Sequence, residues 1–117
     1  MSESRKPKFY QSVAASHPDI FDTLEKLGIA LRRAGPLDVK TAHLLKLAAS
    51  AAVRSEGAVH SHVRRALAAG VTAEEIEHAL LLLIPTIGLP QVIAALSWAR
   101  DIRGATPRTK RSRRSRA

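Results

Sequence analysis

The sequence contains no cysteine, few aromatic residues and no long apolar run. The absence of cysteine excludes disulfide bonds, thiolate metal sites and thiol nucleophiles. Because aromatic residues make up 3% of the chain, the core must be built from Leu, Ile, Val and Ala. No apolar run approaches the roughly 20 residues that span a bilayer, and residues 1–8 are charged without an apolar stretch. We therefore expect no membrane segment, no secretory signal and a cytoplasmic location.

The abundant residues favour helices. The chain has 20 Ala and 14 Leu, whereas Val and Ile together number 14, so strong helix formers outnumber β-branched residues. A length of 117 residues supports one domain. We predict an all-α fold, a bundle of four to six helices over residues 16–105. A mobile lead-in at 1–15 and a disordered basic tail at 106–117 flank it.

The net charge of +9 is concentrated at the C-terminal end. The tail holds six basic residues and no acidic residue, whereas residues 9–105 are nearly neutral. Arg-rich segments without aromatics bind phosphate backbones with little sequence preference. Two interpretations stay open, a weak nucleic-acid or polyanion contact and a solubilising terminus without a partner. The basic residues are Arg108, Lys110, Arg111, Arg113, Arg114 and Arg116.

Several local patterns mark the starts of helices. Thr72 and Glu75 have the spacing of a capping box, in which each side chain bonds the backbone N–H of the other residue. Asp38 is placed to cap an earlier helix, because a carboxylate accepts from the free N–H groups of a first turn. Pro18 and Pro90 lie where a first and a last helix would begin, since proline tolerates the first turn.

Two apolar stretches indicate that subunits associate. Residues 80–84 are apolar on every side of a helix, which predicts a helix that is buried all round. Residues 44–52 form a broad face of Leu and Ala. One small subunit has little material to cover both, so we expect a homo-oligomer; the alternative is that the 80–84 helix is central in a monomer. We also expect a helix break near residues 55–57, because Gly57 interrupts the helical pattern.

Residues 54–62 hold the densest group of titratable side chains beside an apolar stretch. His60 and His62 would point roughly 160° apart on a helix, so a metal pair on one face is not expected. Glu56 and His60 are four residues apart and share a face if the helix runs through Gly57, and a carboxylate with an imidazole can form an acid–base pair. The alternative is that Glu56 and His60 are solvated surface residues and His62 is a hydrogen-bonded core histidine.

Residues 55–76 resemble the core of the carboxymuconolactone decarboxylase family, which includes the alkylhydroperoxidase D-like (AhpD-like) proteins. The family pattern reads Cys-Glu-x-Cys-x-x-x-His, followed by an Ala-rich helix, Gly-Val/Ala-Thr and Glu-Glu-Ile. This chain reads SEGAVHSH at 55–62, then an Ala-rich helix, GVT and EEI. The segment PLDVKTAHLLKLA at 36–48 and IGLP at 87–90 resemble the flanking family segments. The resemblance implies an AhpD-like helical fold that assembles as a trimer or a hexamer.

The chain departs from that pattern at the two redox positions. Ser55 and Ala58 stand where the peroxidase branch has its cysteines, and neither side chain can cycle as a dithiol. The resemblance carries Glu56 and His62 over as site residues, with His60 beside them. In the decarboxylase branch, such residues move protons on a lactone acid without a cofactor. Two functions therefore stay open, cofactor-free acid–base chemistry on a small organic acid or lactone, and a non-catalytic oligomeric binding or scaffold protein with a polyanion-binding tail.

Overall fold

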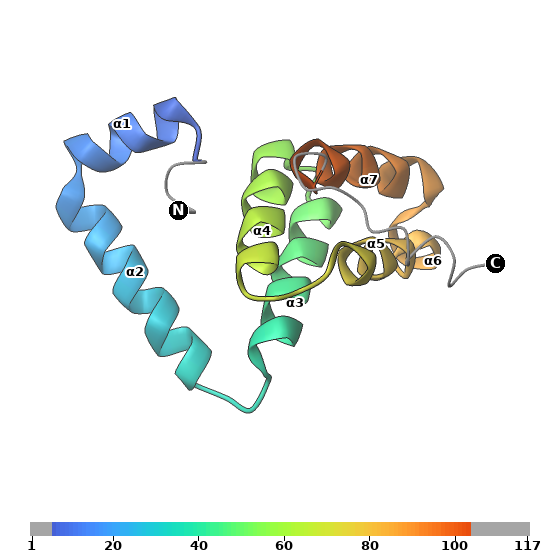
Figure 1. The fold of residues 1–117 in the computed structure, drawn as a ribbon, viewed down its shortest axis with the longest axis horizontal. Helices are drawn as coiled ribbons and strands as arrows, with labels where there is room; N and C mark the ends of the chain where they lie inside the picture. The colour runs from blue at the N-terminus through green and yellow to red at the C-terminus, as the bar shows by residue number, and fades with distance from the viewer. Residues whose placement is uncertain (1–5, 104–117) are drawn as a thin grey trace.

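The computed structural model describes residues 6–103, which fold into seven helices without a strand (Figure 1). Six of these helices have nine or more residues, and α6 is a single turn of four. The predicted all-α class is confirmed. The helices are α1 (Lys8–Ser16), α2 (Pro18–Arg33), α3 (Val39–Ala52), α4 (Glu56–Ala68), α5 (Ala73–Leu81), α6 (Ile84–Ile87) and α7 (Leu89–Arg103).

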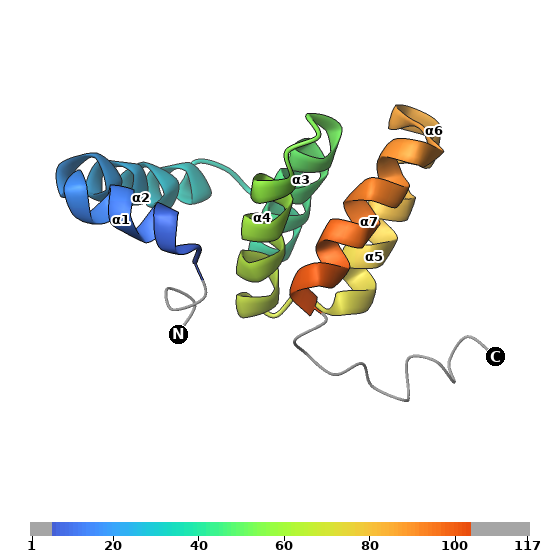
Figure 2. The same ribbon diagram turned by 90° about the horizontal axis from the view of Figure 1, so that it is seen from above.

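Helices α3, α4, α5 and α7 form the body of the molecule. Helix α4 packs against α3 on one side and against α7 on the other, and α5 also packs on α7 (Figures 1 and 2). The core is aliphatic, as the scarcity of aromatic residues requires, and small Ala side chains let the helices approach closely. Its buried residues are Leu47, Ala51, Val59, Val63, Ala66, Val71, Ile76, Leu80, Ala95 and Ala99.

Helix caps fix where the body helices begin. Thr72 accepts a hydrogen bond from the Glu75 backbone N–H at 3.0 Å, and Glu75 accepts from the Thr72 N–H at 2.9 Å, which confirms the capping box. Asp38 accepts from the Thr41 N–H at 2.8 Å and caps α3 as predicted. Hydrogen bonds from the Thr41 side chain and from its backbone N–H lower the pKa of Asp38, because they stabilise the charged carboxylate. The sequence therefore determines the starts of α3 and α5 locally.

The turn between α3 and α4 falls earlier than the glycine suggested. Helix α3 ends at Ala52 and α4 already begins at Glu56, so Gly57 lies inside the first turn of α4. Arg54 lies in the turn between α3 and α4 and has a φ of 59°. This value falls in the left-handed region that non-glycine residues rarely occupy. The predicted break near residues 55–57 is confirmed at Ser55, but Gly57 is not its cause, because the Ser55 side chain caps α4 and sets its start.

The apolar run at residues 80–84 is not buried on every side. Leu80 is fully buried, but Leu81 and Leu82 are 44% and 61% exposed. The expected continuous helix through the run was wrong, because α5 ends at Leu81 and α6 begins only at Ile84. Burial of Leu81 and Leu82 in an oligomer stays a prediction. Because the helix ends inside the apolar run, the residues of the run do not all pack against the same surface.

Helices α1 and α2 form an arm beside the body (Figures 1 and 2). They pack on each other, with the Tyr10 and Phe21 rings edge to face at 5.4 Å between centroids. Neither helix contains a buried residue. Helix α1 forms within the segment in which we expected no regular structure. Within residues 6–103, no helix is long and apolar enough to cross a membrane.

Candidate functional site

The first turn of α4 brings the two redox positions of the family pattern together. The Ser55 hydroxyl accepts a hydrogen bond from the Ala58 backbone N–H at 3.2 Å, and this bond caps α4. Both side chains are half-buried. The hydroxyl thus has a structural role at the place where a thiol would need to be, and the chain has no dithiol chemistry there.

One face of α4 carries His60 among carboxylates. Its Nε2 donates to Asp101 Oδ2 of α7 at 3.0 Å and lies 4.0 Å from Glu56 Oε2. Both carboxylate side chains are more than half exposed. These three residues are close enough to share a divalent cation, with ligand atoms within 4.8 Å of one another. The observed contacts already pair the imidazole with both acids, so the cluster is explained as a polar link between α4 and α7.

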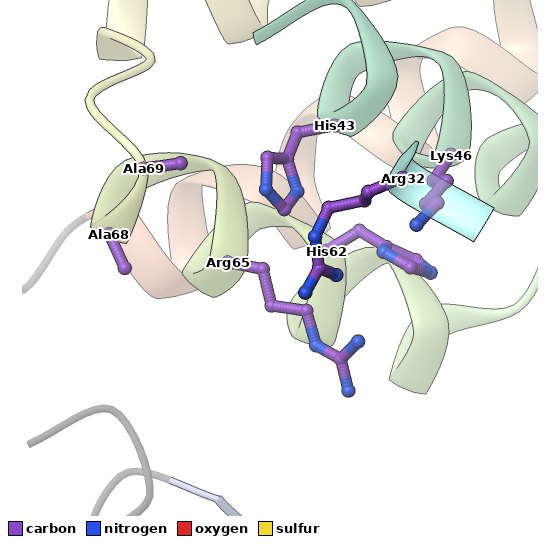
Figure 3. Close-up of a pocket in the computed structure, with 7 residues that line it drawn as sticks. All are labelled: Arg32, His43, Lys46, His62, Arg65, Ala68 and Ala69. Atoms are coloured by element: carbon purple, nitrogen blue, oxygen red, sulfur yellow. The ribbon is translucent and has the colours of Figure 1, made fainter. Parts of the chain in front are cut away.

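The opposite face of α4 borders a pocket of about 290 Å³, which we call the cationic pocket. Arg32 reaches into it from the end of α2, and the other basic side chains come from α3 and α4 (Figure 3). Among the described residues, no acidic side chain lines it. Such a concave group of positive charge favours an anionic ligand. The lining residues are Arg32, His43, Lys46, His62, Arg65, Ala68 and Ala69.

The two histidines of the cationic pocket are held in their neutral form. Burial, together with the positive charges of Arg65 and Lys46, lowers the pKa of His62 to about 4. Burial also lowers the pKa of His43, with Lys46 as the next cause. In both residues Nδ1 is buried without a hydrogen-bond partner. Buried polar atoms normally have partners, so these two nitrogens are unsatisfied in this structure.

The structure separates the predicted site residues into two groups. His62 lines the cationic pocket, whereas Glu56 contacts His60 and does not line it. Glu56 and His60 share a face, as their spacing predicted, and His62 faces elsewhere. The predicted hydrogen bond of a core His62 is missing at Nδ1. The predicted polyanion-binding residues of the tail lie outside the described residues.

Sequence reasoning missed Arg32, His43, Lys46 and Arg65. A signal was present, because both α3 and α4 contain a histidine followed three residues later by a base, His43 with Lys46 and His62 with Arg65. Residues three apart share a helix face. Two such faces in neighbouring helices build a basic surface once the helices pack side by side.

The comparison with protein families agrees with this fold and with the sequence pattern. Residues 18–101 match the carboxymuconolactone decarboxylase family. This span covers α2 to nearly the end of α7, and the chain therefore belongs to that family. No individual curated protein matches the chain.

Proposed function

We propose that the chain binds a small organic anion, a carboxylic acid or lactone acid, in the cationic pocket and exchanges a proton with it through His62. The observation that carries this proposal is the composition of the pocket, with three permanent or near-permanent cations and two neutral histidines. A carboxylate would offset the positive charges of Arg32, Lys46 and Arg65 by charge-assisted hydrogen bonds.

Binding and protonation are coupled in this site. The positive charges that lower the pKa of His62 are the same charges that attract a carboxylate. A bound anion would neutralise part of that field, so the pKa of His62 would rise toward its ordinary value. The ring would thereby become a more effective base only when the ligand is present. This chemistry uses the protein's own groups, and the acid–base role falls on His62 because Glu56 lies with His60.

The test compares the two histidines of α4. Acetate, succinate and small lactone acids are titrated into three proteins, wild type, His62→Gln and His60→Gln. Binding is followed by NMR and by isothermal titration calorimetry. We expect wild type and His60→Gln to bind with the same affinity, and His62→Gln to lose most of it. Equal behaviour of all three variants, or no shift at millimolar ligand, would contradict the proposal.

A turnover assay separates the two functions that the sequence left open. Loss of the lactone ring or release of carbon dioxide by wild type, abolished by His62→Gln, supports an acid–base enzyme. Binding without any product supports a non-catalytic binding protein of the same family.

We further propose that the basic tail contacts polyanions. Six basic residues in the last twelve of the sequence, without an acid, support this proposal. Truncation after Ala105 should abolish heparin or nucleic-acid binding and leave carboxylate binding unchanged. Binding should also fall steeply with salt, because cationic segments release counterions on contact. Salt-independent or tail-independent binding would contradict it.

A further inference from the structure

The polar link between α4 and α7 has the composition of a metal site. It joins Glu56 and His60 of α4 to Asp101 of α7, and we call these three residues the α4–α7 cluster. Each residue offers one ligand atom, and the three atoms lie within 4.8 Å of one another. In the described part of the chain, no other three His, Asp or Glu side chains come this close together.

The distances within the cluster are close to those between ligands of one ion. Metal–ligand bonds of about 2.0–2.2 Å place two ligands of a tetrahedral ion about 3.3 Å apart. His60 Nε2 lies 3.0 Å from Asp101 Oδ2 and 4.0 Å from Glu56 Oε2. The Glu56 side chain is more than half exposed and can rotate, and a shift of about 1 Å brings its carboxylate to the required distance.

The charges of the cluster match a divalent cation. Two carboxylates and a neutral imidazole together carry two negative charges, which balance those of the ion. Among the described side chains, no Lys or Arg forms a salt bridge with Glu56 or Asp101. Arg100, the residue before Asp101, contacts Glu77 instead. An incoming ion therefore has no lysine or arginine to displace from these carboxylates.

Binding of an ion changes the position of one hydrogen. His60 Nε2 is hydrogen-bonded to Asp101 Oδ2, so a hydrogen lies between the two atoms. A metal ion at Nε2 takes the place of that hydrogen, and the neutral ring then carries its hydrogen on Nδ1. Zinc accepts imidazole and carboxylate ligands together, whereas magnesium and calcium prefer oxygen ligands. Three protein ligands also leave a fourth position on zinc for water.

The packing of α7 on α4 distinguishes this cluster from a simple helical pair. Glu74 and His78 of α5 have the same spacing of four residues as Glu56 and His60. In the part of the chain that the structure describes, that pair belongs to no group of three ligand atoms. Asp101 supplies the third ligand to His60 from 41 positions away in the sequence. The α5 pair is therefore a control that the chain itself provides.

We propose that the α4–α7 cluster binds a divalent transition-metal ion, with zinc as the best match, and that the ion ties α4 to α7. This proposal does not depend on the proposed function, because the cluster and the cationic pocket lie on opposite faces of α4. The ligand set joins His60 to Glu56 and not to His62, which lines the cationic pocket.

Calorimetric titration of zinc chloride into the full chain, freed of metal with EDTA, tests the site. We expect Asp101→Asn and His60→Gln each to weaken the tightest zinc site by at least about 10-fold, since loss of an outer-shell partner alone can cost that much. The matched control is His78→Gln, which should keep the wild-type affinity. Wild type without zinc binding at millimolar zinc, an unchanged affinity in Asp101→Asn, or equal losses in Asp101→Asn and His78→Gln would overturn the proposal.

Thermal melting separates a built site from loose adsorption of zinc to surface histidines. An ion that binds the folded chain in preference to the unfolded one raises the melting temperature. We expect zinc to raise the melting temperature of wild type and of His78→Gln, and to raise that of Asp101→Asn much less. Circular dichroism without zinc checks that the three proteins have the same helix content. Equal rises in all three proteins, or no rise in wild type, would contradict an ion that ties α4 to α7.

Discussion

His60 and His62 lie two residues apart on α4, yet the molecule gives them opposite surroundings. His60 contacts the carboxylates of Glu56 and Asp101. His62 lines a pocket whose charged members, Lys46 and Arg65 among them, are all basic. The two faces of α4 differ because α7 packs on one of them and α3 on the other. The comparison shows that the neighbouring helix, not the residue type, decides what a histidine can do.

Because their surroundings differ, we propose different roles for the two histidines. On the His60 face, the imidazole already contacts the carboxylates of Glu56 and Asp101. The His62 face is open, since its positive charges have no acidic partner among the residues that line the pocket. An anion therefore gains more from the His62 face, and the predictions below test that contrast in order of expected effect.

Charge reversal in the cationic pocket should have the largest effect. Arg65→Glu places a carboxylate where the ligand's carboxylate would bind, so we expect carboxylate affinity to fall about 10- to 100-fold, the value of a lost charged hydrogen bond. Arg54→Glu changes the net charge equally at an exposed residue that does not line the pocket. Isothermal titration measures both variants. Equal losses in the two would mean that net charge, not the pocket, governs binding.

The lowered pKa of His62 predicts a loss of stability in mild acid. The unfolded histidine takes up a proton near its ordinary value of 6.5, whereas the folded one does so at about 4. Between these values the unfolded state binds more protons, so the free energy of unfolding falls as the pH is lowered. Thermal melting from pH 7 to 4.5 should show this slope in wild type.

Replacing His62 should reduce the dependence of the melting temperature on pH. His62→Gln cannot take up the proton, and His43→Gln should act in the same direction because burial also lowers the pKa of His43. Melting temperatures of the two variants are compared with wild type over the same pH range. Parallel slopes in all three proteins would show that neither histidine accounts for the acid sensitivity.

The cap at the start of α4 supports both faces and should have a moderate effect. Ser55→Ala removes the hydrogen bond to the Ala58 N–H and should cost about 1 kcal/mol of stability. Ser97→Ala, at an exposed serine inside α7, serves as the control. Urea denaturation measures the difference. A cost as small as that of the control would mean that water replaces the cap.

Weakening the contact between His60 and Asp101 should have the smallest effect. Asp101→Asn weakens an exposed interaction, so we expect a loss of about 0.2–1 kcal/mol and unchanged carboxylate binding. Urea denaturation and ligand titration are run on the same protein preparation. A loss of carboxylate affinity would contradict the separation of the two faces of α4.

Local sequence predicted the elements that depend on neighbouring residues. The capping box of Thr72 and Glu75 and the Asp38 cap are confirmed because each bond joins residues three apart. The break near residues 55–57 is confirmed at Ser55, but its attribution to Gly57 was wrong because Ser55 was overlooked as a cap. The single helix expected over 80–84 was wrong because a helix end inside the run cannot be located from apolar residues alone.

The site was predictable in part. His62 was identified as a site candidate, and the pairing of Glu56 with His60 follows from their spacing of four. The remaining pocket residues come from three helices, and their assembly depends on how α2, α3 and α4 lie in space. The His60 link to Asp101 joins residues 41 positions apart, a contact that periodicity within one helix cannot show.

The sequence by itself determined the all-α class, the starts of α3 and α5, the family and the absence of thiol chemistry, because these depend on composition and on residues close along the chain. The tertiary structure decided which histidine faces acids and which faces bases. It also decided that Ile20, Leu24, Leu27 and Leu31 of α2 stay exposed in one copy. Those outcomes depend on the packing of distant helices, and packing is a property of surfaces that meet only after the chain has folded.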